Sequence, residues 1–158
     1  MIVEHKFKWS REITFITLST IAIIIGGGVY VWLSDMPLEA RIIMLSVLAS
    51  IIAISAIWAP RKITINKNGV KCQLLATAIV IPSSEVILIQ KCDPKDAFKG
   101  CMRLFGSGGL FGYYGVFRNK KFGRFSMYIT QRENMILVTT KRKKYIFNCP
   151  LEHVDNVK

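Results

Sequence analysis

Four cysteines are the residues of this sequence that most readily bind metals or act as nucleophiles. They are Cys72, Cys92, Cys101 and Cys149, and no two of them form the C-x-x-C pair typical of zinc sites. His153 follows Cys149 at position i+4. No oxyanion-stabilising group accompanies this pair in the sequence, so we interpret it as incidental. We therefore expect no metal site, no cofactor and no catalytic residue, and we expect that the protein is not an enzyme.

A glycine-rich segment, residues 98–123, is the second candidate for chemistry, because its glycines alternate with aromatic residues. The run from Gly106 to Gly112 could suggest a phosphate-binding loop, but the Walker pattern G-x-x-x-x-G-K-[ST] does not occur. Phe111 occupies the third glycine position of the dinucleotide-binding pattern. Two interpretations stay open. The segment is either a loop whose aromatic residues pack on the domain or enter the membrane interface, or a loop that binds a ligand or partner.

Basic residues flank this segment and recur in two further turns. Aromatic side chains among glycines, surrounded by Arg and Lys, suit a membrane surface with anionic lipids, where each basic residue contributes about 1 kcal/mol. The basic cluster at residues 141–144 is interpreted as a solvated hairpin turn near such a surface, and no recognition motif indicates nucleic-acid binding. The candidate lipid or partner surface comprises Lys67, Lys71, Arg103, Phe105, Gly106, Gly108, Gly109, Phe111, Gly112, Arg118, Lys120, Lys121, Arg124, Lys141, Arg142, Lys143 and Lys144.

Two apolar runs must position these residues relative to a membrane. Residues 13–33 and residues 42–59 contain no charged residue, and at about 1.5 Å per residue each run is long enough to cross the roughly 30 Å core of a bilayer. Gly26, Gly27 and Gly28 lie in the first run, where small residues let another helix approach closely. The connection, residues 34–41, is so short that the two transmembrane helices must form an antiparallel hairpin.

The positions of Lys and Arg predict the orientation of this hairpin. Lys6, Lys8 and Arg11 precede the first run and further basic residues follow the second, whereas Arg41 alone marks the connection. Cytoplasmic flanks of membrane helices are enriched in Lys and Arg. We therefore expect a cytoplasmic segment at residues 1–12, a short external loop at residues 34–41 and both termini in the cytoplasm. The first 60 residues are neutral, so the net charge of +12 lies entirely in the remainder.

Residues 60–158 are expected to form a cytoplasmic domain rich in β-strands. Alternating apolar residues predict strands at residues 63–65, 70–81, 86–89, 124–130, 135–139 and 145–147. Asn68 and Gly69 predict a tight hairpin turn. Pro150 is expected to start a C-terminal helix at residues 151–157. A series of strands followed by one helix predicts an antiparallel sheet or partial barrel capped by that helix.

Four segments of this domain together resemble the bacterial pleckstrin-homology (PH) domain families. They are residues 103–115 (RLFGSGGLFGYYG), 117–120 (FRNK), 124–130 (RFSMYIT) and 145–147 (YIF). The resemblance covers roughly residues 60–158 and implies a PH-like bent antiparallel β-barrel with a short C-terminal helix. Such domains commonly follow one or two membrane helices. The expected fold is therefore membrane-anchored α+β, with a two-helix transmembrane hairpin followed by the barrel, in a multi-pass protein of the bacterial plasma membrane.

The expected function is that of a membrane-anchored PH-like binding module at the cytoplasmic face. It would bind an unidentified protein or a second copy of itself, and would contact the anionic headgroups of the lipid bilayer. No nucleic-acid partner is expected. The alternative is a structural subunit of a membrane complex, assembled through its transmembrane helices at residues 26–28.

Overall fold

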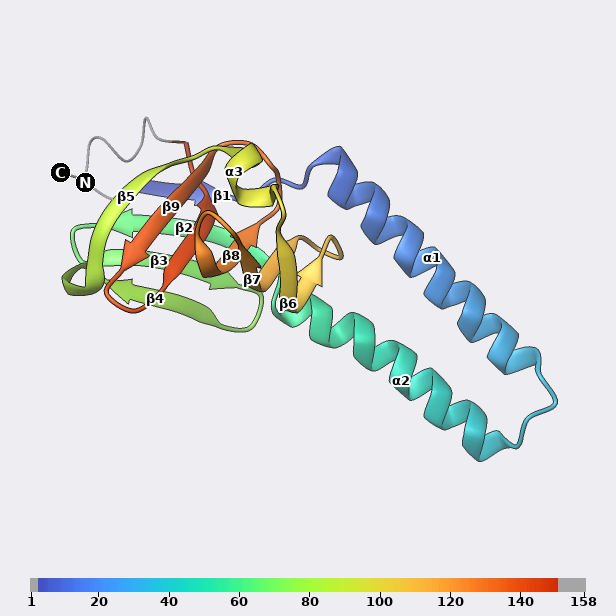
Figure 1. Ribbon diagram of the computed structural model, residues 1–158. Coiled ribbons are helices and arrows are strands. Elements are labelled where there is room, and N and C mark those ends of the chain that lie inside the picture. Colours follow the sequence, from blue (N-terminus) through green and yellow to red (C-terminus); the bar gives the residue numbers. More distant parts are fainter. Residues whose placement is uncertain (1–2, 151–158) are drawn as a thin grey trace.

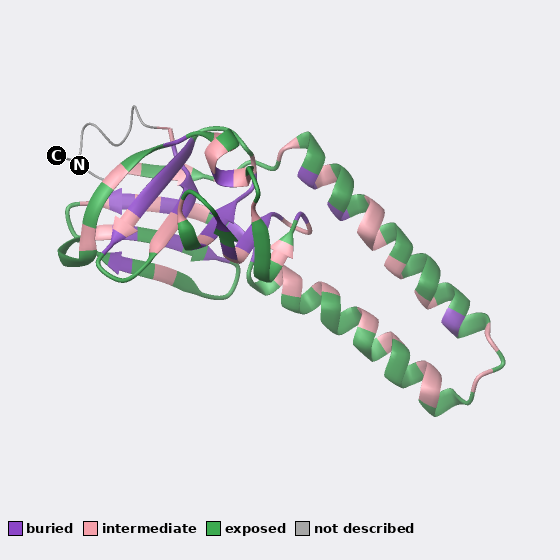
Figure 2. Ribbon diagram, in the orientation of Figure 1, coloured by how far each residue is buried: buried purple, intermediate pink, exposed green. Residues whose placement is uncertain are grey.

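Two long helices project from a β-rich domain in the computed structural model, which describes residues 3–150 (Figure 1). Helix α1 (Arg11–Leu33) and helix α2 (Leu38–Ile57) form a hairpin whose connection lies far from the domain. Both helices are long and apolar enough to cross a membrane. Most of their residues are exposed (Figure 2), as expected for helices that face lipid and not water.

Local hydrogen bonds define both ends of α1. At its start, the Oγ atom of Ser10 accepts a hydrogen bond of 3.2 Å from the backbone N–H of Ile13. At its end, Arg41 donates hydrogen bonds to the carbonyl groups of Met36 and Trp32, at 2.8 Å and 3.2 Å. Arg41, in the first turn of α2, therefore satisfies the carbonyl group of Trp32, one of those that the end of α1 leaves without backbone partners.

The domain consists of two sheets. The four-stranded sheet has the order β1-β2-β3-β4, and its strands are β1 (Val3–Lys6), β2 (Pro60–Asn66), β3 (Gly69–Leu74) and β4 (Ala78–Pro82). The six-stranded sheet has the order β5-β9-β10-β8-β7-β6, and its strands are β5 (Val86–Cys92), β6 (Met102–Gly108), β7 (Tyr113–Asn119), β8 (Gly123–Ile129), β9 (Met135–Thr140) and β10 (Lys144–Asn148). A 3-10 turn, η1 (Ser83–Glu85), joins the two sheets. The expected bent barrel is confirmed, although the sheets do not close on each other and the β8–β10 pair is parallel.

Apolar side chains fill two clusters, one on each face of the six-stranded sheet. The first cluster lies between the two sheets and includes Ile63 and Cys72 from one sheet and Val138 and Phe147 from the other. The second cluster lies on the opposite face, beneath the short helix α3 (Pro94–Phe98). Its buried residues include Ile13 of α1, so the first turn of α1 belongs to the domain core.

The structure corrects several details of the sequence-based expectation. The N-terminal segment contains strand β1, which pairs antiparallel with β2. The strand expected at residues 70–81 is two strands, because the chain turns at residues 75–77 and β3 pairs antiparallel with β4. The tight turn at Asn68 and Gly69 is confirmed. The C-terminal helix expected at residues 151–157 lies outside the described residues.

One buried side chain connects the sheet to the start of α1. Asn148 accepts hydrogen bonds from the backbone N–H groups of Thr130 and Gln131, and donates hydrogen bonds to the carbonyl groups of Gln131 and Glu133. Thr130 in turn donates its hydroxyl hydrogen to the carbonyl of Lys8 at 2.8 Å. The chain that enters α1 is thereby attached to the end of β8.

Candidate functional site

The glycine-rich segment forms a strand hairpin, whereas both sequence-based interpretations treated it as a loop. Strands β6 and β7 pair antiparallel, and Gly106 lies opposite Gly115. Their φ angles are +104° and +120°, and a Cβ atom on either residue would collide with a backbone carbonyl of the opposite strand. The two glycines therefore permit a strand approach that no L side chain allows.

The tip of this hairpin packs on α1. A Cβ atom at Gly109 would lie only 3.0 Å from Cδ1 of Ile16, so the backbone contacts the helix directly. The backbone N–H of Phe111 donates a hydrogen bond of 3.0 Å to Oγ1 of Thr17. The Phe111 ring lies 5.9 Å from the ring of Trp9. These contacts bury Thr17, although the remainder of α1 is largely exposed.

Strand β7 reaches α2 through Tyr114. Its hydroxyl donates a hydrogen bond of 2.6 Å to the backbone carbonyl of Ser55. Burial raises the pKa of Tyr114, which keeps the hydroxyl protonated as a donor. The hairpin thus contacts both helices where they meet the domain. The sequence does not distinguish Thr17, Ser55 or Tyr114 as junction residues. Other hydroxyl residues lie close to Thr17 and Ser55 in both helices, and nothing in the sequence shows which of them the domain contacts.

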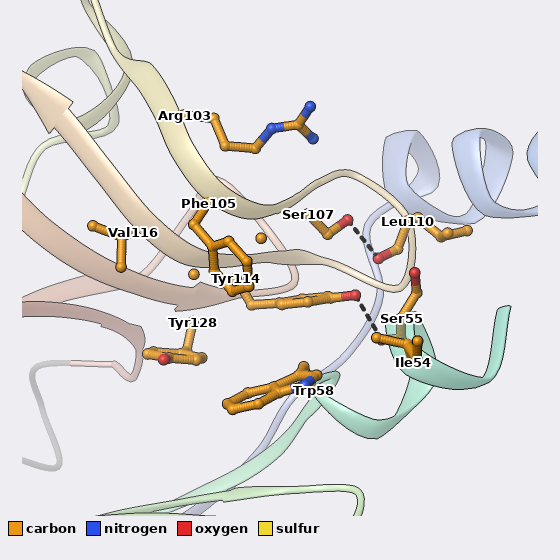
Figure 3. A pocket seen from close by; sticks show the side chains of 12 residues that line it. Ile54, Ser55, Trp58, Arg103, Phe105, Ser107, Leu110, Tyr114, Val116 and Tyr128 are labelled. Carbon is orange, nitrogen blue, oxygen red and sulfur yellow. Dashed lines mark hydrogen bonds between the residues drawn. The ribbon is translucent and has the colours of Figure 1, made fainter. Parts of the chain in front are cut away.

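A pocket of about 530 Å³ opens between the hairpin and the end of α2 (Figure 3). Ile54 and Trp58 form its wall on the side of α2, and Phe105 and Leu110 contribute to its wall on the side of the hairpin. Arg103 is the only charged residue of the lining. Arg103 lies opposite Phe117 in the β6–β7 pair, on the other face of the hairpin from Phe105 and Tyr114, so the pocket is lined mainly by apolar side chains.

The side chain of Arg103 extends along β6 toward the tip of the hairpin. Its Nη1 atom would lie 3.2 Å from a Cβ atom at Gly108, so the absence of a side chain at Gly108 leaves room for the guanidinium group. In Figure 3 this group lies across the β6–β7 hairpin from Trp58. None of the ion pairs found within residues 3–150 involves Arg103. A positive charge without an ion-pair partner among residues 3–150 therefore lies on the other face of the hairpin from the pocket.

The sequence-predicted surface divides into two separate groups. The first follows β6 to the hairpin tip at the junction with the helices, where the side chain of Arg103 also ends, and consists of Arg103, Phe105, Gly106, Gly108, Gly109, Phe111 and Gly112. The second lies at the opposite ends of the strands and consists of Lys67, Lys71, Arg118, Lys120, Lys121, Arg124, Lys141, Arg142, Lys143 and Lys144. We call the second group the distal basic face. The structure therefore does not form one surface from the predicted residues.

Strand direction shows why the distal basic face is remote from the helices. Strand β2 starts directly after α2 and runs six residue steps to Asn66, a distance of about 20 Å. Strand β8 ends beside the start of α1, and β10 runs parallel to β8. Both strands therefore start at the end of the domain that is remote from the helices. Figure 1 shows the β2–β3 and β9–β10 turns on the side of the domain away from the helices. These loops therefore lie at the end of the domain farthest from the helices. The expected lipid contact of their basic residues stays a prediction.

Part of the distal basic face forms a second hollow, of about 420 Å³. Arg124, Arg142 and Lys143 contribute to its lining together with Ser126. Arg124 also lies opposite Arg118 in the β7–β8 pair. Like charges at such short separation repel each other unless an anion lies between them. The hollow is therefore suited to carboxylate or phosphate groups.

The three glycines of α1 differ in their surroundings. A Cβ atom at Gly28 would lie 3.5 Å from Cδ2 of Leu45, which is ordinary contact with α2. A Cβ atom at Gly26 or Gly27 would have no neighbour within 4 Å. Of the three residues expected to pack helices, only Gly28 lies next to α2, and the other two present an open surface.

The described residues contain no group of three or more His, Cys, Asp or Glu side chains that could hold a metal ion. Burial raises the pKa of Cys72 to about 12 and that of Cys149 to about 11. Burial, followed by the nearby carboxylates of Asp96 and Asp93, raises the pKa of Cys92 to about 11. Protonated thiols are poor nucleophiles and poor metal ligands, so these cysteines act as apolar core residues.

Comparison with known proteins agrees with this architecture. The family model described as "Bacterial PH domain" matches residues 61–150. The chain belongs to the bacterial PH domain family. No curated protein matches the chain. No solved structure matches it. Domains of the PH family are generally non-catalytic. The matched region begins shortly after α2, so β1, α1 and α2 lie outside it.

Proposed function

We propose that this protein is a non-enzymatic, membrane-anchored PH module that holds its distal basic face in the cytoplasm to bind an acidic protein. The hairpin α1–α2 would cross the plasma membrane, with both termini and the domain on the cytoplasmic side. The observation that carries the proposal is the separation of the basic turns from the helices by the length of the β-strands. A domain fixed in this way presents its charge to proteins near the membrane.

The way in which the helices join the domain supports this arrangement. The segment before α1 forms β1, and the segment after α2 forms β2, and these strands are neighbours in one sheet. Both ends of the hairpin are therefore on the same side of any membrane that it crosses. The basic residues around these ends favour the cytoplasmic side, because Lys and Arg are enriched in cytoplasmic flanks.

Charge supports an acidic partner in preference to self-association through the same face. The net charge of the chain is +12, and two copies that meet through their distal basic faces would repel each other. An acidic protein surface would instead be attracted. Arg124 and Arg142 supply guanidinium groups that can bind carboxylates through two parallel hydrogen bonds.

Charge reversal on the full-length protein tests this proposal. The variant Arg124→Glu/Arg142→Glu/Lys143→Glu replaces three positive charges of this hollow by negative ones. The matched control is Lys91→Glu/Lys95→Glu/Lys99→Glu, which makes the same change in net charge at exposed residues outside the distal basic face. Proteins cross-linked to each variant in intact membranes are extracted in mild detergent and quantified. We expect acidic proteins bound to the parent and the control to be lost from the distal variant. An identical set of bound proteins for all three would overturn the proposal.

A second candidate function rests on the open surface of α1. Because Gly26 and Gly27 have no neighbour within 4 Å, a helix of another subunit could approach the backbone there. The protein would then be a structural subunit of a membrane complex. The variant Gly26→Leu/Gly27→Leu tests this role by the size of the detergent-extracted assembly. A smaller assembly for this variant, together with an unchanged assembly for the distal variant, would favour the structural role.

A further inference from the structure

We propose that the pocket beside α2 and the hollow of the distal basic face are the two ends of one groove, and that this groove binds an extended segment of an acidic partner protein. An apolar side chain of the segment would fill the pocket, and carboxylates about four residues away would contact the hollow. This proposal rests on the proposed function, and it adds the kind of segment that the distal basic face would recognise.

One residue joins the two cavities. Val116 of β7 lines both the pocket of about 530 Å³ and the hollow of about 420 Å³. It lies opposite Phe105 of β6, which lines the pocket, and opposite Ser126 of β8, which lines the hollow. The two cavities are therefore neighbours on the strands β6, β7 and β8.

The groove lies on one face of the six-stranded sheet. Tyr113 and Phe117 of β7 belong to the core cluster beneath α3, whereas Tyr114 belongs to the cluster between the two sheets. Successive side chains of a strand point to opposite faces, so Val116 and Arg118, on either side of Phe117, share the face of Tyr114.

The positive charge of the hollow lies on this same face. Arg124 of β8 lies opposite Arg118, and Ser126 lies opposite Val116. Figure 3 shows Val116 on the side of the hairpin on which Trp58 lies. The basic end of the groove and its apolar end can therefore contact the same bound segment.

The apolar end suits one large side chain of a partner. Trp58 and Phe105 line the pocket and are 44% and 72% exposed, so both rings have surface to cover. The hydroxyl groups of Tyr114 and Ser107 already donate hydrogen bonds to backbone carbonyl groups. An apolar side chain in the pocket leaves no polar group of its own unpaired, and an aromatic ring gains further contact with the two rings.

The basic end suits more than one carboxylate. Arg124, Arg142 and Lys143 line the hollow, and none of the ion pairs found among residues 3–150 involves them. Each guanidinium group can bind one carboxylate through two parallel hydrogen bonds. The segment is therefore expected to carry a cluster of Asp or Glu residues.

Strand geometry gives the spacing between the two ends. Tyr114 lines the pocket, and Arg118 lies four positions later in β7, opposite Arg124. Four residue steps of a strand span about 13 Å. An extended peptide has the same rise per residue, so its apolar residue and its first carboxylate are expected about four positions apart.

This spacing favours a protein segment over a phospholipid. If α2 crosses the bilayer, Trp58 at its C-cap lies at the level of the lipid headgroups. The hollow then lies roughly 13 Å farther from the bilayer. A phospholipid would have to leave the bilayer for its phosphate to reach Arg124, whereas a segment of a cytoplasmic protein reaches both ends from water.

Fluorescein-labelled peptides test the proposal on the full-length protein in phosphatidylcholine nanodiscs. Each peptide carries one Phe and a cluster of Glu residues, separated by a Gly/Ser spacer of varied length, and fluorescence anisotropy gives its Kd. We expect the tightest binding for a spacer of about three residues. Replacement of the peptide Phe by Gly is expected to weaken binding about tenfold. Equal affinity at all spacer lengths, or with Gly in place of Phe, would overturn the groove.

Two variants of the protein locate the bound peptide. Phe105→Ala should weaken the Phe peptide about tenfold and leave the Gly peptide unchanged, a difference that a loss of folding would not produce. The matched control is Ile87→Ala, because Ile87 is also exposed and belongs to β5 at the opposite edge of the sheet. We expect this control to bind both peptides as the parent does. Equal Kd values for Phe105→Ala and the parent would contradict an anchor in the pocket.

Photo-cross-linking identifies the occupant of the pocket directly. A benzoylphenylalanine in place of the peptide Phe is expected to label the end of α2 at Ile54 or Trp58, as determined by peptide mass spectrometry. Labels found only elsewhere would overturn the groove. So would a phospholipid that native mass spectrometry finds on the parent but not on Phe105→Ala, because a lipid would then occupy the pocket.

The two proposals fail in different ways. If peptides bind through their Glu residues alone, and Arg124→Glu/Arg142→Glu/Lys143→Glu abolishes this binding, the distal basic face stands and only the groove fails. If that variant binds the peptides as the parent does, both the groove and the acidic-partner function fail.

Discussion

The backbone N–H of Phe111 donates its hydrogen bond to Oγ1 of Thr17, a residue 94 positions earlier in the chain. Phe111 has a φ angle of +58°, a conformation that costs a non-glycine residue roughly 1–2 kcal/mol. The hydrogen bond and the contact with Trp9 offset this cost. Thr17 therefore determines where the hairpin tip lies on α1.

Replacement of Thr17 by Val is expected to loosen this junction. Val has the shape of Thr but cannot accept a hydrogen bond, so the N–H of Phe111 loses its partner at a cost of about 1–3 kcal/mol. Thermal unfolding of the full-length protein in detergent micelles should show a lower Tm for Thr17→Val. Thr17→Ser keeps the hydroxyl and should retain most of the parent Tm. Equal Tm values for Thr17→Val and the parent would show that this hydrogen bond does not hold the hairpin.

Replacement of Gly115 by Ala is expected to disrupt the hairpin itself. The added Cβ atom would collide with the carbonyl of Phe105, and the alanine would have to adopt an unfavourable φ of +120°. We expect a loss of more than about 3 kcal/mol of folding free energy. Gly123 is the matched control, because its φ is +70° but a Cβ atom there has no neighbour within 4 Å. Gly123→Ala should cost only about 1–2 kcal/mol, and denaturant unfolding of the two variants compares these costs.

The sequence predicts the parts of this fold that depend on local patterns. The charge-free runs predict α1 and α2, and the pair Asn68 and Gly69 predicts the β2–β3 turn, because each signal lies within one element. Strand β1 was missed because Val3–Lys6 contains three polar or charged residues, and only pairing with β2 makes it a strand. Residues 75–77 contain no Gly or Pro, so the β3–β4 turn gives no local signal.

The candidate site was less predictable because it depends on strand register. The glycines of residues 98–123 indicate a loop when each is considered alone, whereas Gly106 opposite Gly115 shows that they serve close strand pairing. The parallel pairing of β8 with β10 determines that Arg124 and Lys143 are remote from the helices. No pattern within either strand contains that information.

Replacement of Asn148 by Ala is expected to destabilise the domain strongly. The amide makes four hydrogen bonds with the backbone of residues 130–133, and its side chain is fully buried. Its removal leaves several buried backbone groups without partners, and we expect a cost of about 3 kcal/mol or more. Gln131→Ala is the control, because the bonds in this region that involve Gln131 use its backbone. A small effect of Asn148→Ala on denaturant unfolding would mean that water replaces the amide.

The four cysteines are expected to differ in their reactivity. Cys101 is partly exposed, whereas Cys72, Cys92 and Cys149 are buried. The pKa values of these three thiols are raised from 9.0 to about 11–12. The folded protein therefore keeps them protonated below about pH 11, whereas the unfolded chain ionises its thiols near pH 9.

When the pH is raised from 7 to 9, we expect a maleimide to label Cys101 first and the other three only after unfolding in denaturant. Peptide mass spectrometry measures this order, and Cys101→Ser should abolish the early labelling. Rapid labelling of Cys72 in the folded protein would contradict its place in the core between the two sheets.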